Sequence, residues 1–468
     1  MSGDEFEDPP EERFPALTAL FERYPLAYAG YRISHLLRHD RDISESDEIP
    51  FVTNPIFPIA IVGYLVLSRV RGLLDGSLGD GPVGPGPASG PVDHVFSMTS
   101  TQGYRTHTFL EVAATLSEAG EDVVFLCSPA AADRREEWER EGYDTVTHRE
   151  LHRGVSILAL LRDIVAAVVQ TAALVRTADV ERGIGNYVLY YNFVLLEHVK
   201  RESVRPLTAG DPLVHTYSPM PYLVDAAGTE RLFVYQHGIQ QNIGGKIMAA
   251  PFCFPLTYLV WGEPWKRNFE RFVHSDSEIV TVGSPWYEYL ADQRDSDRSP
   301  THDVLLVSDS HGLTDEVEPA FEEMVEAVLD VCERGERSLA VKLHPLEDAD
   351  WYERRGWGEY VVDYDDIDDA LLDARVAVVN TSTAFVESAV LGVPVVVADL
   401  WERGLSELAP VDLVRFTDGP AVGEAVEAGL TDPDSFSNPD SAPLVVLGDA
   451  TVRIRELTEQ RRDELEER

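Results

Sequence analysis

Several polar residues lie where predicted strands end, and two of them belong to the segment 338–345, SLAVKLHP. The apolar residues of this segment predict a buried strand, and the proline at its end predicts that the strand stops there. The strand therefore ends at Lys342 and His344, a cation and an imidazole. Both kinds of side chain can contact the oxygens of a phosphate group.

Residues 374–400 predict a strand–helix–strand unit. An apolar run ends at Asn380, a helix follows and ends at Gly392, and a second apolar run comes next. Ser382 and Thr383 lie at the start of this helix. Unpaired backbone N–H groups and the helix dipole favour a phosphate at such a position.

The hydroxyl pair has a second interpretation, because Ser and Thr are also common N-caps of helices. Glu387 lies four residues after Thr383, so the two side chains share one helix face. Glu387 is not at the capping-box spacing from either hydroxyl, so local capping does not account for it. The sequence leaves open whether the pair caps the helix or binds a phosphate.

His237 is the candidate catalytic residue. It follows the predicted strand 232–236 and precedes Gly238, so we expect it at the carboxyl end of that strand, where open α/β sheets bind ligands. An imidazole has an unperturbed pKa of about 6.5, which suits the removal of a proton from a hydroxyl near neutral pH. The alternative is a buried structural histidine.

Four further residues are weaker candidates for the same cleft. They are Lys246 in a glycine-containing loop, Ser310 and His311 after the first strand of the second half, and His107 in a predicted turn, residues 103–107. Lys246 could equally belong to a surface loop.

An HP-containing strand end, a Ser/Thr pair and a glutamate one helical turn later resemble the donor half of GT-B-type glycosyltransferases. The closer likenesses are the poly(glycerol-phosphate) polymerases, which use CDP-glycerol, and the bacterial sialyl- and polysialyltransferases. The resemblance implies that His344, Ser382 and Thr383 hold the phosphates of a nucleotide. Lys342 and Glu387 are further candidates for the same donor site.

The resemblance extends over residues 92–468. It implies that His237 is the general base, as in the His-Gly element of the polymerases, and that Gly283 and Ser284 form an inter-domain turn near the nucleotide. The polymerases typically carry Trp-His-Gly, whereas Gln236 precedes the histidine here, and this departure counts against glycerol-phosphate transfer specifically. The chain also lacks the Gly-Thr-Arg-Pro-Glu-like opening of the hydrolysing UDP-GlcNAc epimerases, which share this fold.

The composition sets the class of protein. The 468 residues are enough for two or three domains, and 82 acidic against 39 basic residues give a formal net charge of −43. Only four lysines occur, and this acidic, lysine-poor composition predicts adaptation to a salt-rich cytoplasm, where charges are screened within about 3 Å at 1 M salt. The charge argues against nucleic-acid binding, which needs a basic surface.

The sequence indicates neither a disulfide framework nor a metal site. The three cysteines are single and lie in apolar surroundings, which fits a reducing cytoplasm. The acidic start of the chain is unlike a signal peptide. An Asp-x-Asp pattern at 363–365 matches metal-dependent transferases, but its acidic surroundings before a short helix favour a solvated turn.

Residues 1–90 predict a separate helical extension. Its uncharged run 51–68 is followed by Arg69 and Arg71, and the segment 79–91 is a Gly/Pro linker. A buried helix, an interfacial or re-entrant helix and a full membrane span all remain open for the run, so peripheral membrane contact through 51–71 is one expectation. A second long apolar helix, at 151–176, is expected to pack against the sheet.

The elements predict an α/β fold in two halves, and the resemblance implies that it is GT-B-like, with two Rossmann-type domains around a central cleft. The helical extension covers 1–90, the acceptor domain 91–291 and the nucleotide-donor domain 292–468. The expected activity is metal-independent transfer of a glycosyl or polyol-phosphate group from a nucleotide-activated donor, without a cofactor, to a cell-surface glycan or lipid-linked acceptor. It would take place in the cytoplasm, at the inner face of the membrane. A sugar-nucleotide epimerase and a non-catalytic glycan- or nucleotide-binding protein are the alternatives.

Overall fold

The structure is a computed structural model, and the residues that it describes are 14–31, 92–98, 103–128, 131, 134–147, 150–151, 156–177, 184–218, 220–237, 254–271, 273–294, 299–308, 317–344, 347, 349–380, 382–400, 405–408, 411–437 and 443–468. The predictions for Lys246, Ser310, His311, the run 51–71 and the linker 79–91 lie outside these residues.

The first half is a seven-stranded parallel sheet in the order β3-β2-β1-β4-β5-β6-β7. Its strands are β1 (His94–Met98), β2 (Val123–Cys127), β3 (Asp144–Thr147), β4 (Leu213–Thr216), β5 (Leu232–Tyr235), β6 (Thr257–Val260) and β7 (Glu278–Thr281). The strands β1, β2 and β5 are mostly apolar and buried along their whole length, because helices cover both faces of a parallel sheet. The order reverses between β1 and β4, which is where such sheets bind ligands.

The second half is a six-stranded parallel sheet in the order β10-β9-β8-β11-β12-β13. Its strands are β8 (His302–Val307), β9 (Leu339–Lys342), β10 (Val361–Val362), β11 (Ala374–Val379), β12 (Val395–Ala398) and β13 (Val414–Thr417). The predicted strand–helix–strand unit is β11, α18 (Ala384–Val390) and β12, with Gly392 at φ +76° after the helix. The α/β class with two Rossmann-type sheets is therefore confirmed.

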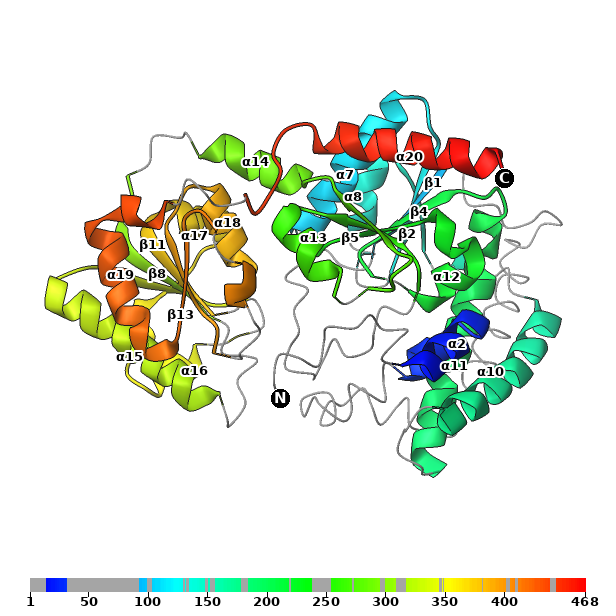
Figure 1. The fold of residues 1–468 in the computed structure, drawn as a ribbon, viewed down its shortest axis with the longest axis horizontal. Helices are drawn as coiled ribbons and strands as arrows, with labels where there is room; N and C mark the ends of the chain where they lie inside the picture. The colour runs from blue at the N-terminus through cyan, green and yellow to red at the C-terminus, as the bar shows by residue number, and fades with distance from the viewer. Residues whose placement is uncertain are drawn as a thin grey trace.

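Helices surround the two sheets (Figure 1). In the first half they are α7 (Gly103–Glu118), α8 (Arg135–Arg140), α12 (Pro221–Ala227) and α13 (Glu263–Phe269). In the second half they are α15 (Glu318–Gly335), α16 (Asp350–Glu353), α17 (Ile367–Leu372) and α19 (Val422–Thr431). The predicted turn at 103–107 is wrong, since α7 begins at Gly103 and no proline or second glycine interrupts the residues after it.

Two helices join the halves. α14 (Pro285–Gln293) follows β7 and packs on both α7 and α18. The chain then returns after the second sheet, and α20 (Ala450–Glu466) packs on α7 of the first half, as Figure 1 shows. The predicted bounds of the domains stay predictions, but the last helix of the segment assigned to the donor domain lies on the first sheet.

A helical layer lies beside the first sheet, made of α2 (Pro15–Arg23), α10 (Ile157–Thr177) and α11 (Ile184–Thr208) (Figure 1). The main packing partner of α10 is α11, and α2 packs on α10 as well. The expectation that the apolar helix at 151–176 packs against the sheet is therefore wrong: one face of α10 packs against other helices, and the opposite face is exposed.

Candidate functional site

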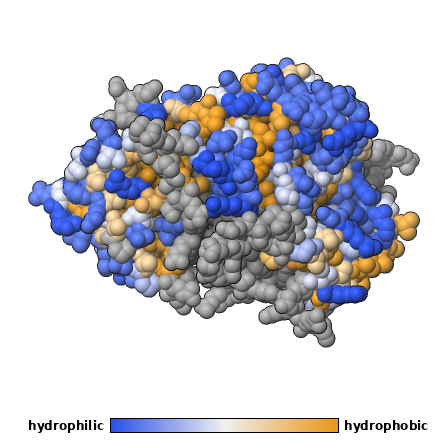
Figure 2. Space-filling view, in the orientation of Figure 1, coloured by the Kyte–Doolittle hydropathy of each residue, from blue (hydrophilic) through white to orange (hydrophobic). Residues whose placement is uncertain are grey.

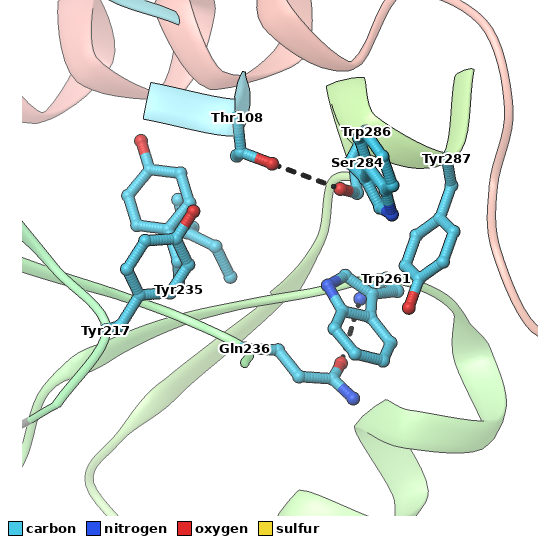
Figure 3. A pocket seen from close by; sticks show the side chains of 10 residues that line it. Thr108, Tyr217, Tyr235, Gln236, Trp261, Ser284, Trp286 and Tyr287 are labelled. Carbon is cyan, nitrogen blue, oxygen red and sulfur yellow. Dashed lines mark hydrogen bonds between the residues drawn. The ribbon is translucent and has the colours of Figure 1, made fainter. Parts of the chain in front are cut away.

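A cavity of about 300 Å³, its open mouth included, lies at the carboxyl edge of the first sheet. Residues at the ends of β4, β5, β6 and β7 line it, and α7 and α14 close it from the other side (Figure 3). Its wall consists of Thr108, Tyr217, Tyr235, Gln236, Leu259, Trp261, Gly283, Ser284, Trp286 and Tyr287. A wall of aromatic rings with a few polar side chains is typical of pockets for small polar ligands.

His237 lies beside this cavity. It lies two residues after the end of β5, at the carboxyl end of the strand as predicted, and its ring centroid is 6.1 Å from that of Tyr217 in the cavity wall. The preceding residue, Gln236, is buried, and its side-chain oxygen accepts a hydrogen bond from the backbone N–H of Trp261 (3.1 Å). This bond ties the ends of β5 and β6 together, which gives the glutamine a structural role at the rim.

The turn at 283–284 has two functions in the structure. Ser284 is buried in the cavity wall, and its hydroxyl lies 3.5 Å from that of Thr108 on α7. Gly283 has φ +78°, and a Cβ there would lie 2.2 Å from the carbonyl oxygen of Val446. The returning C-terminal segment therefore requires a glycine at this position, and the approach of a nucleotide to Gly283 stays a prediction.

Glu387 connects the second half to the cavity. It lies on α18, is 6% exposed, and faces Trp286 of the cavity wall. Burial raises the pKa of the Glu387 carboxyl to about 7, Asp368 adds to the rise, and the Trp286 indole opposes it. This carboxyl can therefore be protonated near neutral pH and act as a hydrogen-bond donor.

His107 lies on α7 against two aromatic rings of α14. Its ring centroid is 5.7 Å from that of Trp286 and 5.2 Å from that of Tyr289. Burial lowers the pKa of His107, and Glu111 opposes this shift. Its buried Nδ1 has no hydrogen-bond partner among the described residues, so a ring nitrogen open to a ligand contact lies next to the cavity wall.

The predicted donor residues lie at the carboxyl ends of neighbouring strands in the second sheet. Lys342 ends β9 and is followed closely by His344, whose backbone N–H donates to the Glu347 carboxylate (2.9 Å). Ser382 and Thr383 follow β11, and β8 lies between the two strands. The topology therefore brings these four residues to one sheet edge.

The hydroxyl pair is partly engaged in local structure. The Ser382 hydroxyl accepts a hydrogen bond from the backbone N–H of Ala384 (3.3 Å), a local turn contact just before the helix. Thr383 is the N-cap of α18 and makes no capping bond with its side chain. The roles of both hydroxyls toward a phosphate stay predictions.

A chain of hydrogen bonds runs from α20 through the first sheet to the cavity. Arg462 Nη2 lies 3.2 Å from His94 Nε2, and Arg462 Nη1 donates to Glu121 (2.7 Å). His94 Nδ1 lies 3.0 Å from His215 Nε2, and His215 Nδ1 lies 2.9 Å from the Tyr235 hydroxyl. Tyr235 is part of the cavity wall, so the chain ends at the candidate site.

The proton positions along this chain follow from its first member. Burial, with a smaller contribution from Arg462, lowers the pKa of His94 to about 3, and burial lowers that of His215 as well, so both rings are neutral. Arginine can only donate, so His94 Nε2 accepts and Nδ1 carries the proton. His215 must then accept on Nε2 and donate from Nδ1 to Tyr235. The tyrosine hydroxyl therefore has its own proton left to donate to a ligand in the cavity.

The structure thus groups some of the predicted residues and separates others. His237, His107, Gly283, Ser284 and Glu387 lie in or beside one cavity wall. Lys342, His344, Ser382 and Thr383 form a second group on the other sheet. In the described part of the chain, no cluster of three His, Cys, Asp or Glu side chains could hold a metal ion.

Sequence reasoning missed the aromatic wall. Tyr217, Trp261, Trp286 and Tyr287 each come within three residues of a strand end or follow the Gly-Ser-Pro turn directly. Aromatic residues directly after several predicted strands were the available signal. The chain of hydrogen bonds from Arg462 to Tyr235, called the relay below, left no signal in the sequence, because its members are separated by up to 368 residues.

Comparison with known proteins gives matches among solved structures only. No family model matches the chain, and no curated protein matches it. The glycotransferase of kitacinnamycin is 15% identical, with a TM-score of 0.42 over 80% of this chain and 96% of the other. The UDP-GlcNAc 2-epimerase from Methanocaldococcus jannaschii, solved with UDP-GlcNAc and UDP, is 11% identical, with a TM-score of 0.47 over 79% and 99%.

The wall teichoic acid polymerase TagF, as its H548A variant, is 11% identical, with a TM-score of 0.39 over 86% of this chain and 98% of the other. Transferases and an epimerase, the two enzyme classes weighed from the sequence, thus both occur among the matches. Because the sequence identities and TM-scores are low, these matches do not indicate the substrate of this chain.

Proposed function

We propose that this chain transfers a glycosyl or polyol-phosphate group from a nucleotide-activated donor to an acceptor hydroxyl. One observation supports the proposal above the others: the aromatic cavity lies at the carboxyl edge of the first sheet and its wall reaches Glu387 of the second half. Two ligand groups, one at each sheet edge, could meet in such an arrangement.

In this proposal the second sheet holds the donor. Lys342 and His344 neutralise the leaving phosphates, and Ser382 and Thr383 add hydroxyl donors. Protein groups alone then stabilise the leaving group, so the reaction needs no metal ion. Glu387 donates a hydrogen bond from its protonated carboxyl.

The first sheet holds the acceptor. His237 lies at the end of β5 beside the cavity, where it removes the proton of the acceptor hydroxyl. Tyr235 donates to an oxygen of the bound ligand from within the wall. The acceptor is a cell-surface glycan or a lipid-linked sugar, and the reaction takes place on the cytoplasmic side of the membrane.

A sugar-nucleotide epimerase is the second candidate. The neutral His107, with its buried Nδ1 unbonded among the described residues, offers a second base beside the cavity. An epimerase needs such a base but no acceptor.

The test is to incubate the purified chain with CMP-, CDP-, UDP- and GDP-activated sugars and polyols in high salt, with and without oligosaccharide or lipid-linked acceptors. We expect acceptor-dependent release of the nucleotide, and activity that survives EDTA. Epimerised sugar without acceptor would favour the second candidate. Nucleotide binding without any turnover would contradict both.

A further inference from the structure

One face of α10 is apolar and exposed. Its members are spaced by three and four residues, so they form a single stripe along the helix: Leu158, Leu161, Val165, Val168 and Val169. They are five of the seven large apolar side chains that are exposed in the described part of the chain. Figure 2 shows hydrophobic side chains at the lower right edge, where α10 lies in Figure 1.

The exposed fractions of these side chains show that they do not belong to the hydrophobic core. Leu158 is 77% exposed, Val165 64% and Leu161 55%. Within the 20-residue segment Leu158–Thr177, an 18-residue window has a mean hydropathy of 1.8, and 28% of the residues in that window are buried. The helix is thus long and apolar enough to cross a membrane, although its other face packs against the protein.

The stripe carries no exposed acidic residue, in contrast to the rest of the chain. Acidic residues are 82 of 468, so about three or four are expected in a helix of 21 residues. The only acid of α10 is Asp163, which is 1% exposed. The charges on the exposed face are Arg162 and Arg176, so this face is apolar and cationic on a strongly acidic protein.

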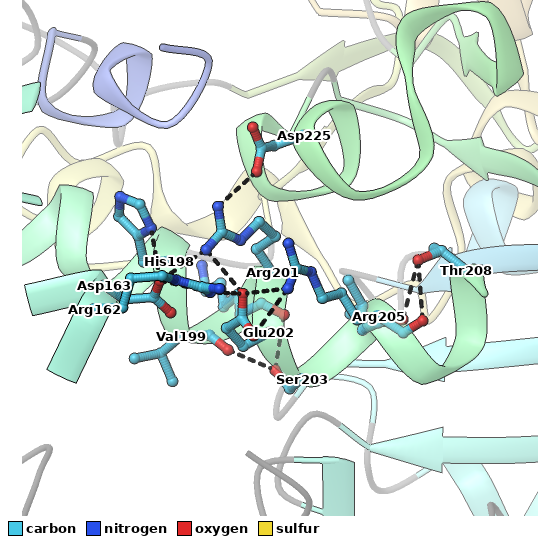
Figure 4. A network of polar contacts seen from close by, with 12 residues as sticks. Arg162, Asp163, His198, Val199, Arg201, Glu202, Ser203, Arg205, Thr208 and Asp225 are labelled. Carbon is cyan, nitrogen blue, oxygen red and sulfur yellow. Dashed lines mark hydrogen bonds and ion pairs between the residues drawn. The ribbon is translucent and has the colours of Figure 1, made fainter. Parts of the chain in front are cut away.

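A buried ion network fixes which face of α10 points outward (Figure 4). Asp163 accepts from Arg201 of α11 at 2.9 Å, and Arg201 also bonds to Glu202 and to Asp225 of α12. Arg162 extends from the exposed face back to Glu202 at 2.7 Å. Rotating α10, or drawing it into a bilayer as a span, would break these bonds and expose Asp163 to hydrocarbon.

We propose that the exposed face of α10 binds a lipid bilayer, with the helix lying in the plane of the membrane surface. The apolar stripe would enter the acyl boundary, and Arg176 would contact the lipid phosphates, while Arg162 stays paired with Glu202. The cationic, acid-free face complements an anionic membrane, whereas the rest of the chain, at −43, repels it.

A second copy of the chain fits this face less well. A helix of 21 residues is about 31 Å long, so a stripe about 10 Å wide offers about 300 Å². A stable interface needs about 800 Å² on each partner. Pairing two such faces would also bring cationic side chains together.

The test is flotation of the full-length chain with vesicles of phosphatidylcholine and about one third phosphatidylglycerol. The variant Leu158→Ser/Leu161→Ser/Val165→Ser removes most of the stripe at exposed positions, so folding should be unaffected by circular dichroism. We expect the wild-type chain to float with the vesicles and the variant to lose at least about tenfold in partition coefficient.

Single variants provide the matched control. Leu158→Ser should weaken flotation measurably, whereas Leu447→Ser, an exposed leucine away from α10, should leave it unchanged. Arg176→Gln should weaken binding only to vesicles that contain the anionic lipid.

Three results would overturn the proposal. The first is that the wild-type chain does not float with the vesicles. The second is that the triple variant floats as well as the wild type, which would place any membrane contact elsewhere, for example at 51–71. The third is a dimer, measured by light scattering, that the triple substitution dissociates; a second copy is then the partner.

Discussion

At the residue scale, the relay that ends at Tyr235 makes a prediction about proton positions. The order of donors requires both His94 and His215 to carry their proton on Nδ1 at neutral pH. Nitrogen chemical shifts of the two imidazole rings, measured by NMR on histidine-labelled protein, report the tautomer directly. Protons on Nε2 would show that Tyr235 is not forced to donate into the cavity.

The same relay predicts the effects of two substitutions. Tyr235→Phe removes one hydroxyl donor, and we expect ligand affinity to fall roughly fivefold, as for a hydrogen bond of about 1 kcal/mol. Arg462→Leu should change the tautomers and weaken binding similarly, whereas Arg462→Lys keeps a donor and should restore most of it. Equal behaviour of the Leu and Lys variants would contradict a positioning role for Arg462.

Glu387 gives a prediction on pH. Its folded pKa of about 7 lies above the value near 4.5 for an exposed carboxyl, so the folded state binds more protons between these pH values. Glu387 therefore favours the folded state fully below pH about 4.5, and this contribution is lost as the pH rises through 7. We expect Glu387→Gln to stabilise the protein at pH 8 relative to wild type, by at most about 3 kcal/mol, and to have a much smaller effect at pH 5. Urea unfolding at both pH values measures this, and an equal effect at both would exclude a raised pKa.

The sequence could indicate single site residues but not their grouping. His237 follows its strand as predicted, because a strand that stops before a glycine can be recognised locally. The aromatic cavity wall could not be predicted, since its residues come from separate strands whose order the sequence does not specify. Glu387 was identified from helix spacing, but its burial against Trp286 depends on packing between α14 and α18.

At the scale of elements, the returning C-terminal segment holds the joint between the halves. The Trp265 indole donates to the Leu444 carbonyl (2.8 Å), and the Val446 N–H donates to the Trp261 carbonyl (2.8 Å). The segment therefore lies against the end of β6 beside the cavity. A shift of this segment would move part of the cavity wall.

Gly283 tests this packing. Gly283→Ala adds a Cβ that would lie 2.2 Å from the Val446 carbonyl, at φ +78°. Gly142→Ala is the matched control, because Gly142 has φ +97° but no atom within 4 Å of such a Cβ. Both variants should lose about 1 kcal/mol of stability through the left-handed backbone, and Gly283→Ala roughly 1–3 kcal/mol more. Equal unfolding midpoints in urea would mean that the segment moves aside freely.

Element types were largely predictable, whereas the contacts of long helices were not. Apolar runs broken by glycine and proline identified most strands of both sheets. The apolar character of α10 indicated burial, but its apolar residues surround the helix, so composition could not show which face stays exposed. α20 buries only Ala450, Ile454 and Thr458, a stripe too narrow to predict its return to the first half.

At the scale of the whole molecule, the net charge of −43 makes a prediction on salt. Acidic groups repel one another, and salt screens this repulsion over about 10 Å at 0.1 M and about 3 Å at 1 M. We expect the melting temperature of the purified chain to rise as KCl increases to molar concentrations. Sucrose at matched osmolality is the control for general solvent effects, and an equal rise in sucrose would exclude screening as the cause.

The two-sheet architecture also separates the proposed roles, with the acceptor on the first sheet and the donor on the second. This division predicts that a change at the end of β5 alters chemistry without altering donor binding. A substitution at His237 therefore tests the effect on chemistry separately from the effect on donor binding.

The most direct measurement is therefore the turnover and donor affinity of His237→Ala, with His344→Ala measured beside it. If His237 is the general base, His237→Ala should lower turnover by roughly 10²–10⁴-fold and remove the acidic limb of the pH–rate profile, with donor affinity unchanged by calorimetry. His344→Ala should instead weaken donor binding, since a charge-assisted contact contributes about 1.5–3 kcal/mol. Near-normal turnover in a folded His237→Ala enzyme would contradict the proposed mechanism.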